Sequence, residues 1–382
     1  MCIRDRFSED QQMIMDLARE IAEENIKPLA SKYDQEEKFP WESVKQLQEL
    51  GFMGMMVEEE YDGTGLDTIC YALAMEEISK ACASTGVTMS VNNSLYAYPV
   101  QKYGTAEQKE EFLRPIVSKK IGAFALSESD AGSDPASMRT TALKNKDGYV
   151  INGSKMWITN GGVADNFIVF AKTDSKKGHK GISAFIMNKD DKGLKIGAEE
   201  KKLGIKASST TPLSFDECLI PENRLLGDLG EGFKIAMNTL NGGRIGIASQ
   251  AIGIGQAAIE SAKKYMVERH AFGGPIAKFQ GLQFMMADSV MEIEAAKALT
   301  LKAASMKDRG ERFVKEAAMA KLYSSEAAVR AADRSLQIHG GAGYSKDFPV
   351  ERYWRDAKIT AIYEGTSEIL RVVIARETLG RY

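Results

Sequence analysis

Residues 149–159 of the 382-residue chain read Tyr149-Val150-Ile151-Asn152-Gly153-Ser154-Lys155-Met156-Trp157-Ile158-Thr159 and mark where a β region interrupts the helical patterns. They contain two runs of β-branched and aromatic residues, which favour strands. The Asn152-Gly153 pair between them tolerates the positive φ angles of a tight turn, so the pattern predicts a β-hairpin. Short apolar runs on both sides predict further strands at 123–126, 167–171, 182–187 and 213–215. Residues 121–230 are therefore predicted to form a β-rich middle domain.

Helical patterns occupy the chain on both sides of this region. Before it, Ser8 and Gln11 form a capping-box pattern at the start of a helix that Pro28 is expected to end. Further helices are predicted around 42–50, 68–81, 88–103 and 106–118, which gives an N-terminal helical domain over 1–120. A C-terminal helical domain is predicted over 231–382, with helices at 233–268, 281–307, 313–338 and 367–379. Gly340-Gly341 is expected to end the third of these. This order favours an α+β chain of three regions over a doubly wound sheet.

Composition and charge exclude several classes of protein. The balance of 50 basic against 53 acidic residues gives a formal net charge of −3, which argues against binding nucleic acid through bulk positive charge. No uncharged apolar run approaches the roughly 18 residues that cross a membrane, so no span is expected. The cysteines and histidines are scattered without metal-binding spacing, so no metal site is expected. The charged opening segment lacks the apolar core of a signal peptide, and the cytoplasm is the expected compartment.

One glycine motif invites a cofactor interpretation. Gly253-Ile254-Gly255-Gln256-Ala257-Ala258 matches the G-x-G-x-x-A pattern of dinucleotide-binding turns. Such a turn needs a strand before it and a helix N-terminus within it, whereas this match lies inside a long helical pattern. Close packing between helices is therefore the favoured interpretation of these glycines.

Two segments are candidates for chemistry. Glu364 lies in Ile362-Tyr363-Glu364-Gly365-Thr366, just before a helix that Thr366 or Ser367 can cap. In an apolar cavity, desolvation would raise the pKa of this carboxylate and make it a better base, although a surface glutamate near a helix start is a common alternative. The second segment, 126–134, contains small polar residues after a strand. Its amides and hydroxyls can bind a polar ligand or form a solvated turn.

Taken together, the motifs carry a family resemblance. Five of them occur in order along the chain, namely 124–134, 152–160, Arg269-His270-Ala271-Phe272-Gly273, Gln337-Ile338-His339-Gly340-Gly341-Ala342-Gly343-Tyr344 and 362–366. From about Phe7 to Tyr382, the chain resembles an acyl-CoA dehydrogenase, closest to the short-chain, butyryl-CoA type. The resemblance implies an N-terminal helical domain, a middle β domain and a C-terminal four-helix domain. It also implies noncovalent FAD, a homotetramer, oxidation of an acyl-CoA thioester to the trans-2-enoyl-CoA, and electron transfer to electron-transfer flavoprotein.

The same resemblance implies roles for particular residues. Glu364 would be the base that removes the α-proton, while the β-hydrogen leaves as hydride to flavin N5. The Glu364 backbone N–H and a flavin ribityl hydroxyl would hold the thioester oxygen. The residues expected to contact FAD are Phe124, Leu126, Ser127, Ser133, Trp157, Ile158, Thr159, Thr366 and Glu368. Arg269, Phe272, Gln280, Gln337, Gly340 and Gly341 would reach FAD from a neighbouring subunit. Ser133, Asn241, Arg244 and Gly365 would contact the acyl-CoA.

Alternatives within and outside the family remain. Isovaleryl-type relatives carry their base at the position before Arg244, which here is Gly243 and cannot act as one. A branched-chain acyl-CoA dehydrogenase is one alternative, and a flavin-containing binding protein that has lost catalysis is another. A helical scaffold without cofactor is a weaker one. The motifs do not discriminate acyl-chain length, electron acceptor or direction of flux.

Overall fold

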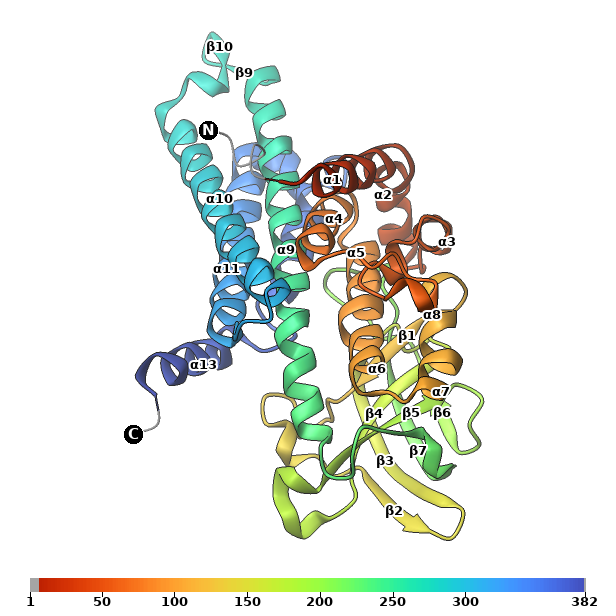
Figure 1. Cartoon of the computed structure of the whole chain (residues 1–382). Coiled ribbons are helices and arrows are strands. Elements are labelled where there is room, and N and C mark those ends of the chain that lie inside the picture. Colours follow the sequence, from red (N-terminus) through yellow and green to blue (C-terminus); the bar gives the residue numbers. More distant parts are fainter. Residues whose placement is uncertain (1–6, 381–382) are drawn as a thin grey trace.

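The computed structural model describes residues 7–380, and its first elements are helical (Figure 1). These helices are α1 (Glu9–Ile21), α2 (Lys27–Glu36), α3 (Trp41–Glu49), α4 (Thr68–Ala81), α5 (Ala83–Ser90), α6 (Tyr98–Tyr103), α7 (Ala106–Gln108) and α8 (Arg114–Ser118). Three π-helical segments continue the chain between them, at Ala22–Ile26, Val91–Ala97 and Lys109–Leu113. As a result, 83–103 is one uninterrupted helical stretch.

The strands follow as a group, and long helices come after them. The strands are β1 (Gly122–Ala125), β2 (Thr141–Asn145), β3 (Gly148–Thr159), β4 (Asn166–Lys172), β5 (Ile182–Asn188), β6 (Leu194–Ile196), β7 (Thr210–Ile220) and β8 (Leu225–Leu226). The last group consists of α9 (Gly232–Glu268), α10 (Gln280–Asp308), α11 (Val314–His339), α12 (Val350–Thr360) and α13 (Ser367–Leu379), with short strands β9 (His270–Ala271) and β10 (Gly274–Pro275) between α9 and α10. The predicted α+β class is confirmed, with helices on both sides of a β region.

The sheet connects the β region to the helices through β4. Seven strands lie in the order β6-β7-β3-β2-β4-β5-β8, and β1 pairs with β4 in parallel. Along β4, Phe167 and Val169 face a core made by the strands, whereas Ile168 and Phe170 face a core shared with the helices. This strand is buried on both faces, which explains its continuous apolar sequence.

The C-terminal helices α9, α10, α11 and α12 run antiparallel in succession. Trp354 near the start of α12 donates to Asp333 near the end of α11. Ser325, which comes earlier in α11, donates to the Thr360 carbonyl at the end of α12, so these two helices are antiparallel. The glycine motif lies within α9, as predicted. A Cβ at Gly253 would overlap the Glu76 carbonyl of α4, and one at Gly255 would overlap Ile293 of α10. Helix packing, and not dinucleotide binding, is therefore the role of these glycines.

Asn152-Gly153 does not form the predicted hairpin. β3 runs through both residues, and the turn instead lies between β2 and β3, after Asn145. Gly153 has a φ of 142° at a shift in the β3–β7 register, and a Cβ there would overlap Thr140. An Asn-Gly pair permits positive φ in a turn or in a bulge, and pairing with β7 selects the bulge.

Two helix predictions also need correction. Pro28 does not end the first helix, because the chain continues through Ala22–Ile26 into α2, where Pro28 occupies the first turn. The proline lacks the N–H of one helical hydrogen bond, and the π-helical segment directly before it accommodates this loss without a break in the helix. Helix α12 was not predicted, although Val350, Tyr353 and Ala357 are buried at helical spacing. None of the helices formed by residues 7–380 combines the length and apolar character that crossing a bilayer requires.

Candidate active site

A short turn between α12 and α13 carries Glu364. Both Glu364 (φ 51°) and Gly365 (φ 100°) have positive φ angles. Glycine adopts this conformation freely, whereas a glutamate adopts it at a cost of about 1–3 kcal/mol. The Thr366 side chain accepts a hydrogen bond from the Ile369 N–H at 3.3 Å and caps α13, as predicted. The turn ends α12, and the cap starts α13, which continues along α11 in the same direction as α12.

Glu364 is half-buried, with one oxygen of its carboxylate withdrawn from solvent between the helices. Its Oε2 atom is buried and has no hydrogen-bond partner among residues 7–380. It lies against Gly243 of α9, where any Cβ would overlap it. Burial raises the pKa of Glu364 to about 7, while the positive charges of Lys321 and Arg244 act in the opposite direction. A carboxylate with one oxygen withdrawn from solvent and a pKa raised in this way accepts a proton near neutral pH.

Gly243 leaves room for the Glu364 carboxylate. A Cβ at position 243 would overlap the Oε2 atom of Glu364, so a side chain there would displace the carboxylate. Positions 243 and 364, far apart in the sequence, therefore converge on one location in the fold.

Lys321 of α11 was not predicted as a site residue. Its side chain is fully buried, and Nζ donates to the Gly365 carbonyl at 2.7 Å. Burial lowers the pKa of Lys321 to about 7, partly offset by the Glu364 charge. The available signal was a lone lysine on a helix face otherwise made of small residues, Ala317, Ala320 and Ser324. Such a lysine usually extends toward solvent, and this one does not.

Arg244 is a second buried cation near Glu364. Its Nη1 donates to Asn241 at 2.8 Å, one turn earlier on α9, and its Nε is buried without a partner among residues 7–380. Desolvation lowers the pKa of Arg244, opposed by the negative charge of Glu364. The structure thus brings together three of the predicted residues, Glu364, Arg244 and Asn241. A polar ligand would satisfy the unpaired Nε.

Tyr363 fixes the turn from the other side. Its hydroxyl donates to Gln250 of α9, and the Gln250 amide donates to the Ala83 carbonyl at 2.9 Å. These bonds tie the turn both to α9 and to the start of the long helical stretch 83–103. The residue next to Glu364 is therefore held by two elements of different domains.

In the β region, a buried ion pair fixes the turn that follows β1. Lys155 of β3 is fully buried and donates to Glu128 at 2.8 Å and to the Leu126 carbonyl at 3.1 Å. Glu128 also accepts from the Arg139 N–H at 2.6 Å and from Thr140. The segment 126–134 is thus an ordered turn built around a buried carboxylate rather than a loosely solvated loop.

Trp157 is turned outward beside that turn. The β3–β7 register shifts between Lys155 and Ile158, and Trp157 has a φ of 62° within this bulge. The indole is 59% exposed, whereas Lys155 and Ile158 on the same strand are buried. The Met156 N–H donates to the Ser127 carbonyl at 2.9 Å, so the bulge and the turn after β1 lie side by side. Bulges commonly redirect a side chain in this way at binding sites.

The other residues predicted in this region differ in exposure. Phe124, Leu126 and Ile158 have buried side chains, and Phe124 packs against Phe170 with ring centroids 4.9 Å apart. Their contribution to a ligand is therefore limited mainly to backbone atoms. Ser127 and Thr159 are half-buried, and Ser133 is exposed. These three hydroxyls remain available for hydrogen bonds.

One helical stretch connects the Trp157 bulge to Glu364. At the end of β3, the Asn160 amide donates to the Thr88 carbonyl at 3.3 Å. Seven residues later, Leu95 packs at Gly243, next to Glu364. Seven helical residues span about 10 Å. The helix between 88 and 95 therefore places the exposed indole and the Glu364 carboxylate around one region of the molecule.

The remaining predicted residues lie at the opposite end of the bundle. Arg269 and Phe272 are exposed at the β9–β10 end of α9 (Figure 1), and Phe272 is 96% exposed. Four other predicted residues are exposed at the same end, namely Gln280, Gln337, Gly340 and Gly341. At this end, the Ser261 hydroxyl of α9 forms a hydrogen bond with His339 Nε2 at 3.3 Å. Helix α9 has 37 residues and is about 55 Å long. Within one chain, these residues do not reach the β region.

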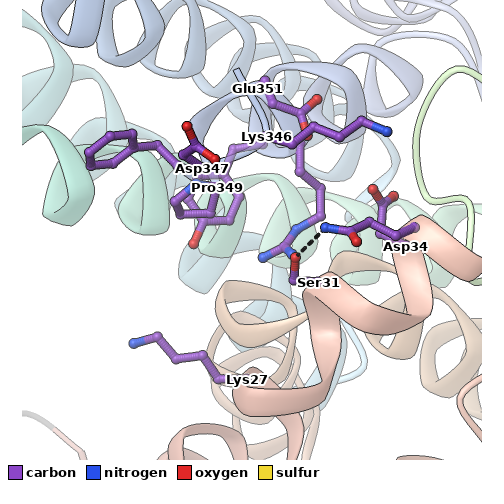
Figure 2. A pocket seen from close by; sticks show the side chains of 11 residues that line it. Lys27, Ser31, Asp34, Lys346, Asp347, Pro349 and Glu351 are labelled. Carbon is purple, nitrogen blue, oxygen red and sulfur yellow. Dashed lines mark hydrogen bonds between the residues drawn. The ribbon is translucent and has the colours of Figure 1, made fainter. Parts of the chain in front are cut away.

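Two hollows flank the C-terminal helices. One, of about 320 Å³, is lined by Thr366 and Glu368 at the start of α13, together with Arg330, Lys358 and Ile362. Figure 2 shows the other, of about 260 Å³, between α2 and the start of α12. Asp34, Lys346 and Glu351 line that second pocket, and none of the predicted site residues does.

Comparison with known protein families identifies the chain. Residues 8–120 match the N-terminal domain of acyl-CoA dehydrogenases, residues 123–218 match the middle domain and residues 230–379 match the C-terminal domain. The chain belongs to the acyl-CoA dehydrogenase family, as the resemblance indicated. It is an enzyme of this family of flavoprotein oxidoreductases, which act on acyl-CoA thioesters.

Individual relatives are similar over almost their whole length. The chain is 51% identical over 375 residues to the mitochondrial short-chain specific acyl-CoA dehydrogenase of Rattus norvegicus, covering 98% of this chain and 91% of the relative. It is 44% identical to the solved butyryl-CoA dehydrogenase of Megasphaera elsdenii, with a TM-score of 0.96 over 98% of this chain and 99% of that one. A chain solved in work on the electron transferring flavoprotein of Acidaminococcus fermentans is 47% identical, with a TM-score of 0.98 over 100% of both chains.

Proposed function

We propose that this enzyme dehydrogenates short-chain acyl-CoA thioesters, such as butyryl-CoA, to trans-2-enoyl-CoA, with Glu364 as the base. One observation carries the proposal, namely the Glu364 carboxylate, whose buried Oε2 has no hydrogen-bond partner among residues 7–380. With a pKa of about 7, this group is matched to accepting a proton at neutral pH. The similarity to short-chain and butyryl-CoA dehydrogenases supports the chain length.

The geometry suggests how the α-proton is removed. The Cα–H bond of the substrate breaks, its proton moves to the Glu364 carboxylate, and a Cα=Cβ double bond forms as the Cβ hydrogen leaves with its electron pair. Negative charge develops on the thioester oxygen during this step. The Glu364 backbone N–H, fixed by the turn, is a donor in position to stabilise that charge. The left-handed conformation at Glu364 thus serves both the side chain and the amide.

Arg244 and Asn241 are proposed to bind the acyl-CoA. The unpaired Nε of Arg244 is a buried donor that a carbonyl or phosphate oxygen of the CoA arm would satisfy. Gly365 adjoins the base and would line the same path. Ser133 is exposed at the turn after β1, where its hydroxyl would reach the CoA arm.

The residues around the Trp157 bulge fit a flavin. The exposed indole offers an apolar surface to a flat ring, and the hydroxyls of Ser127 and Thr159 lie on the flanking segments. FAD, when bound here, supplies the acceptor for the hydride that leaves the substrate. The backbones of Phe124, Leu126 and Ile158 would line the ring, while Thr366 and Glu368 would contact the adenosine part. This arrangement supports the proposed cofactor because an exposed tryptophan otherwise has no packing role.

The distant residues support a proposed homo-oligomer, with a tetramer as the expected state. Six of the residues expected to contact FAD cannot reach the β region of their own chain. They are Arg269, Phe272, Gln280, Gln337, Gly340 and Gly341. If they contact FAD, they do so on a neighbouring subunit. Electron-transfer flavoprotein is the proposed electron acceptor, and the similarity to the Acidaminococcus fermentans chain supports it.

The experiment that tests the function replaces the base. Glu364→Gln keeps the shape of the side chain but removes its basicity. The purified variant should be yellow and folded, yet butyryl-CoA should bleach its flavin at least about 10²-fold more slowly than in the unaltered enzyme, as expected when a general base is lost. Glu294→Gln, on the exposed side of α10, is the matched control and should bleach normally.

A panel of substrates tests the chain length in the same assay. Butyryl-CoA should bleach the flavin of the unaltered enzyme faster than isovaleryl-CoA or octanoyl-CoA. Rapid bleaching of the Glu364→Gln variant would overturn the assignment of the base. Preference for a branched substrate would instead place the enzyme with the branched-chain subgroup.

A further inference from the structure

Lys321 is fully buried, and among residues 7–380 no carboxylate lies within ion-pair distance of it. Its Nζ makes one hydrogen bond, to the Gly365 carbonyl at 2.7 Å. A buried ammonium without a direct ionic partner is destabilising by several kcal/mol. A residue kept in such a position requires a role that offsets this cost.

The single hydrogen bond acts on the turn that presents the base. Gly365 follows Glu364, and both have positive φ angles. Holding the Gly365 carbonyl from α11 fixes the peptide orientation at this strained point. On the other side, Tyr363 is held through Gln250 of α9. The base therefore lies between two anchored neighbours.

Up to about pH 7, where at least half of the Lys321 side chains are protonated, the charge of Lys321 acts on the carboxylate itself. Lys321 and Arg244 are the two cations that oppose the desolvation of Glu364. Tyr71 and Tyr363 also face the carboxylate, and each remains neutral because burial raises its phenol pKa well above 10. Glu368 of α13 interacts with Lys321 at longer range. Lys321 is thus one of two positive charges directed at an otherwise uncompensated carboxylate.

We propose that Lys321 is a positioning residue for the base: its ammonium holds the Gly365 carbonyl and its positive charge stabilises the carboxylate form of Glu364. The inference deepens the proposed function and rests on it for the chemistry. A neutral donor would satisfy one carbonyl at a lower desolvation penalty than an ammonium. The use of a lysine at this place is therefore explained by its charge.

The test measures the ionisation of Glu364 directly. The carboxylic-acid C=O band of Glu364 is isolated by subtracting the infrared spectrum of Glu364→Gln from that of the unaltered enzyme at each pH. The same subtraction is then made in the Lys321→Met background, where the side chain keeps its length but loses both donor and charge. Removing the cation favours the neutral acid, so the midpoint should rise by about one pH unit. An unmoved or lowered midpoint overturns the proposal, even if Lys321→Met changes stability.

Kinetics supply the second readout. With butyryl-CoA near pH 7, flavin bleaching in Lys321→Met should be slowed up to about tenfold, because a shift of one pH unit reduces the ionised base by that factor. The rate should recover toward that of the unaltered enzyme at higher pH, with the dissociation constant for butyryl-CoA unchanged. A rate lowered equally at every pH would indicate a merely structural role and overturn the proposal.

Lys297→Met is the matched control. Lys297 is a mostly buried lysine of α10 that pairs with Glu76 at 2.5 Å, away from the turn at Glu364. Its replacement should lower stability and leave the infrared midpoint of Glu364 unchanged. If the unaltered enzyme is not bleached by butyryl-CoA, the proposed function fails, while the infrared midpoint still decides the role of Lys321.

Discussion

Lys155 and Lys321 are both fully buried, and the molecule holds them in opposite ways. Lys155 in the β region forms an ion pair with Glu128 at 2.8 Å and donates to the Leu126 carbonyl. Lys321 in the helical domain has one carbonyl partner and no ion pair within the described chain. The paired lysine stabilises a turn, whereas the charge of the unpaired one acts on the neighbouring Glu364 carboxylate. Burial of a charge is thus informative only together with the partner that compensates it.

The largest effect is expected from breaking the paired lysine. Lys155→Met should lower the free energy of unfolding by about 3–5 kcal/mol, because the Glu128 carboxylate stays buried without its cation. The turn at 126–134 should loosen, so the variant should also lose flavin more readily in gel filtration. Urea denaturation at pH 7 measures the loss, and Lys144→Met, an exposed lysine of β2, is the control. A decrease in the free energy of unfolding of less than about 1 kcal/mol would show that the ion pair between Lys155 and Glu128 does not stabilise the fold.

Replacing Glu364, beside Lys321, is expected to raise the free energy of unfolding, the opposite of the effect at Lys155. Burial raises the folded-state pKa of Glu364 from 4.5 to about 7, so between these pH values the folded chain binds more protons than the unfolded chain. The contribution of Glu364 to the free energy of unfolding is therefore fully present below about pH 4.5 and is lost as the pH rises through 7. Glu364→Gln removes this loss and should raise the free energy of unfolding by about 2–3 kcal/mol at pH 8.

At pH 5, where most of the Glu364 side chains are protonated in the folded state, the same substitution should change stability little. Chemical denaturation of the flavin-loaded enzyme at both pH values makes the measurement. The exposed Glu294→Gln variant provides the baseline and should show no such pH-dependent gain. Equal stability of the Glu364→Gln variant and the unaltered enzyme at pH 8 would mean that the carboxylate is better solvated than its position against Gly243 indicates.

The sequence predicted the regular elements well because local signals determine them. Helices 68–81 and 367–379 have the predicted bounds, since caps and apolar periodicity act within a few residues. Long-range packing determines the features that were missed. The bulge at Trp157 depends on the register with β7, and the hairpin prediction at Asn152-Gly153 failed for the same reason.

The candidate site likewise divides into residues that the sequence predicted and residues that only the packing of the helices reveals. A motif pointed to Glu364 and the family resemblance to Arg244, but no local pattern marks Lys321, because its contact arises only when the turn between α12 and α13 packs on α11 and brings the Gly365 carbonyl within reach. The overlap between positions 243 and 364 likewise exists only in three dimensions. Residue types and spacing can therefore suggest a base, whereas the charges that tune it become visible when the helices are packed.

The smallest effect is expected at Arg244, the other incompletely paired cation. Its one hydrogen-bond partner is Asn241, and its Nε is free among the described residues. If the acyl-CoA accepts a hydrogen bond from this Nε, Arg244→Ala should raise the dissociation constant for butyryl-CoA about tenfold or more, because a charge-assisted hydrogen bond contributes at least about 1.5 kcal/mol. Calorimetry in the Glu364→Gln background avoids turnover during the titration. Arg312→Ala, an exposed arginine paired with Glu377, should bind as tightly as the parent, and an unchanged constant for Arg244→Ala would show that Arg244 serves Glu364 alone.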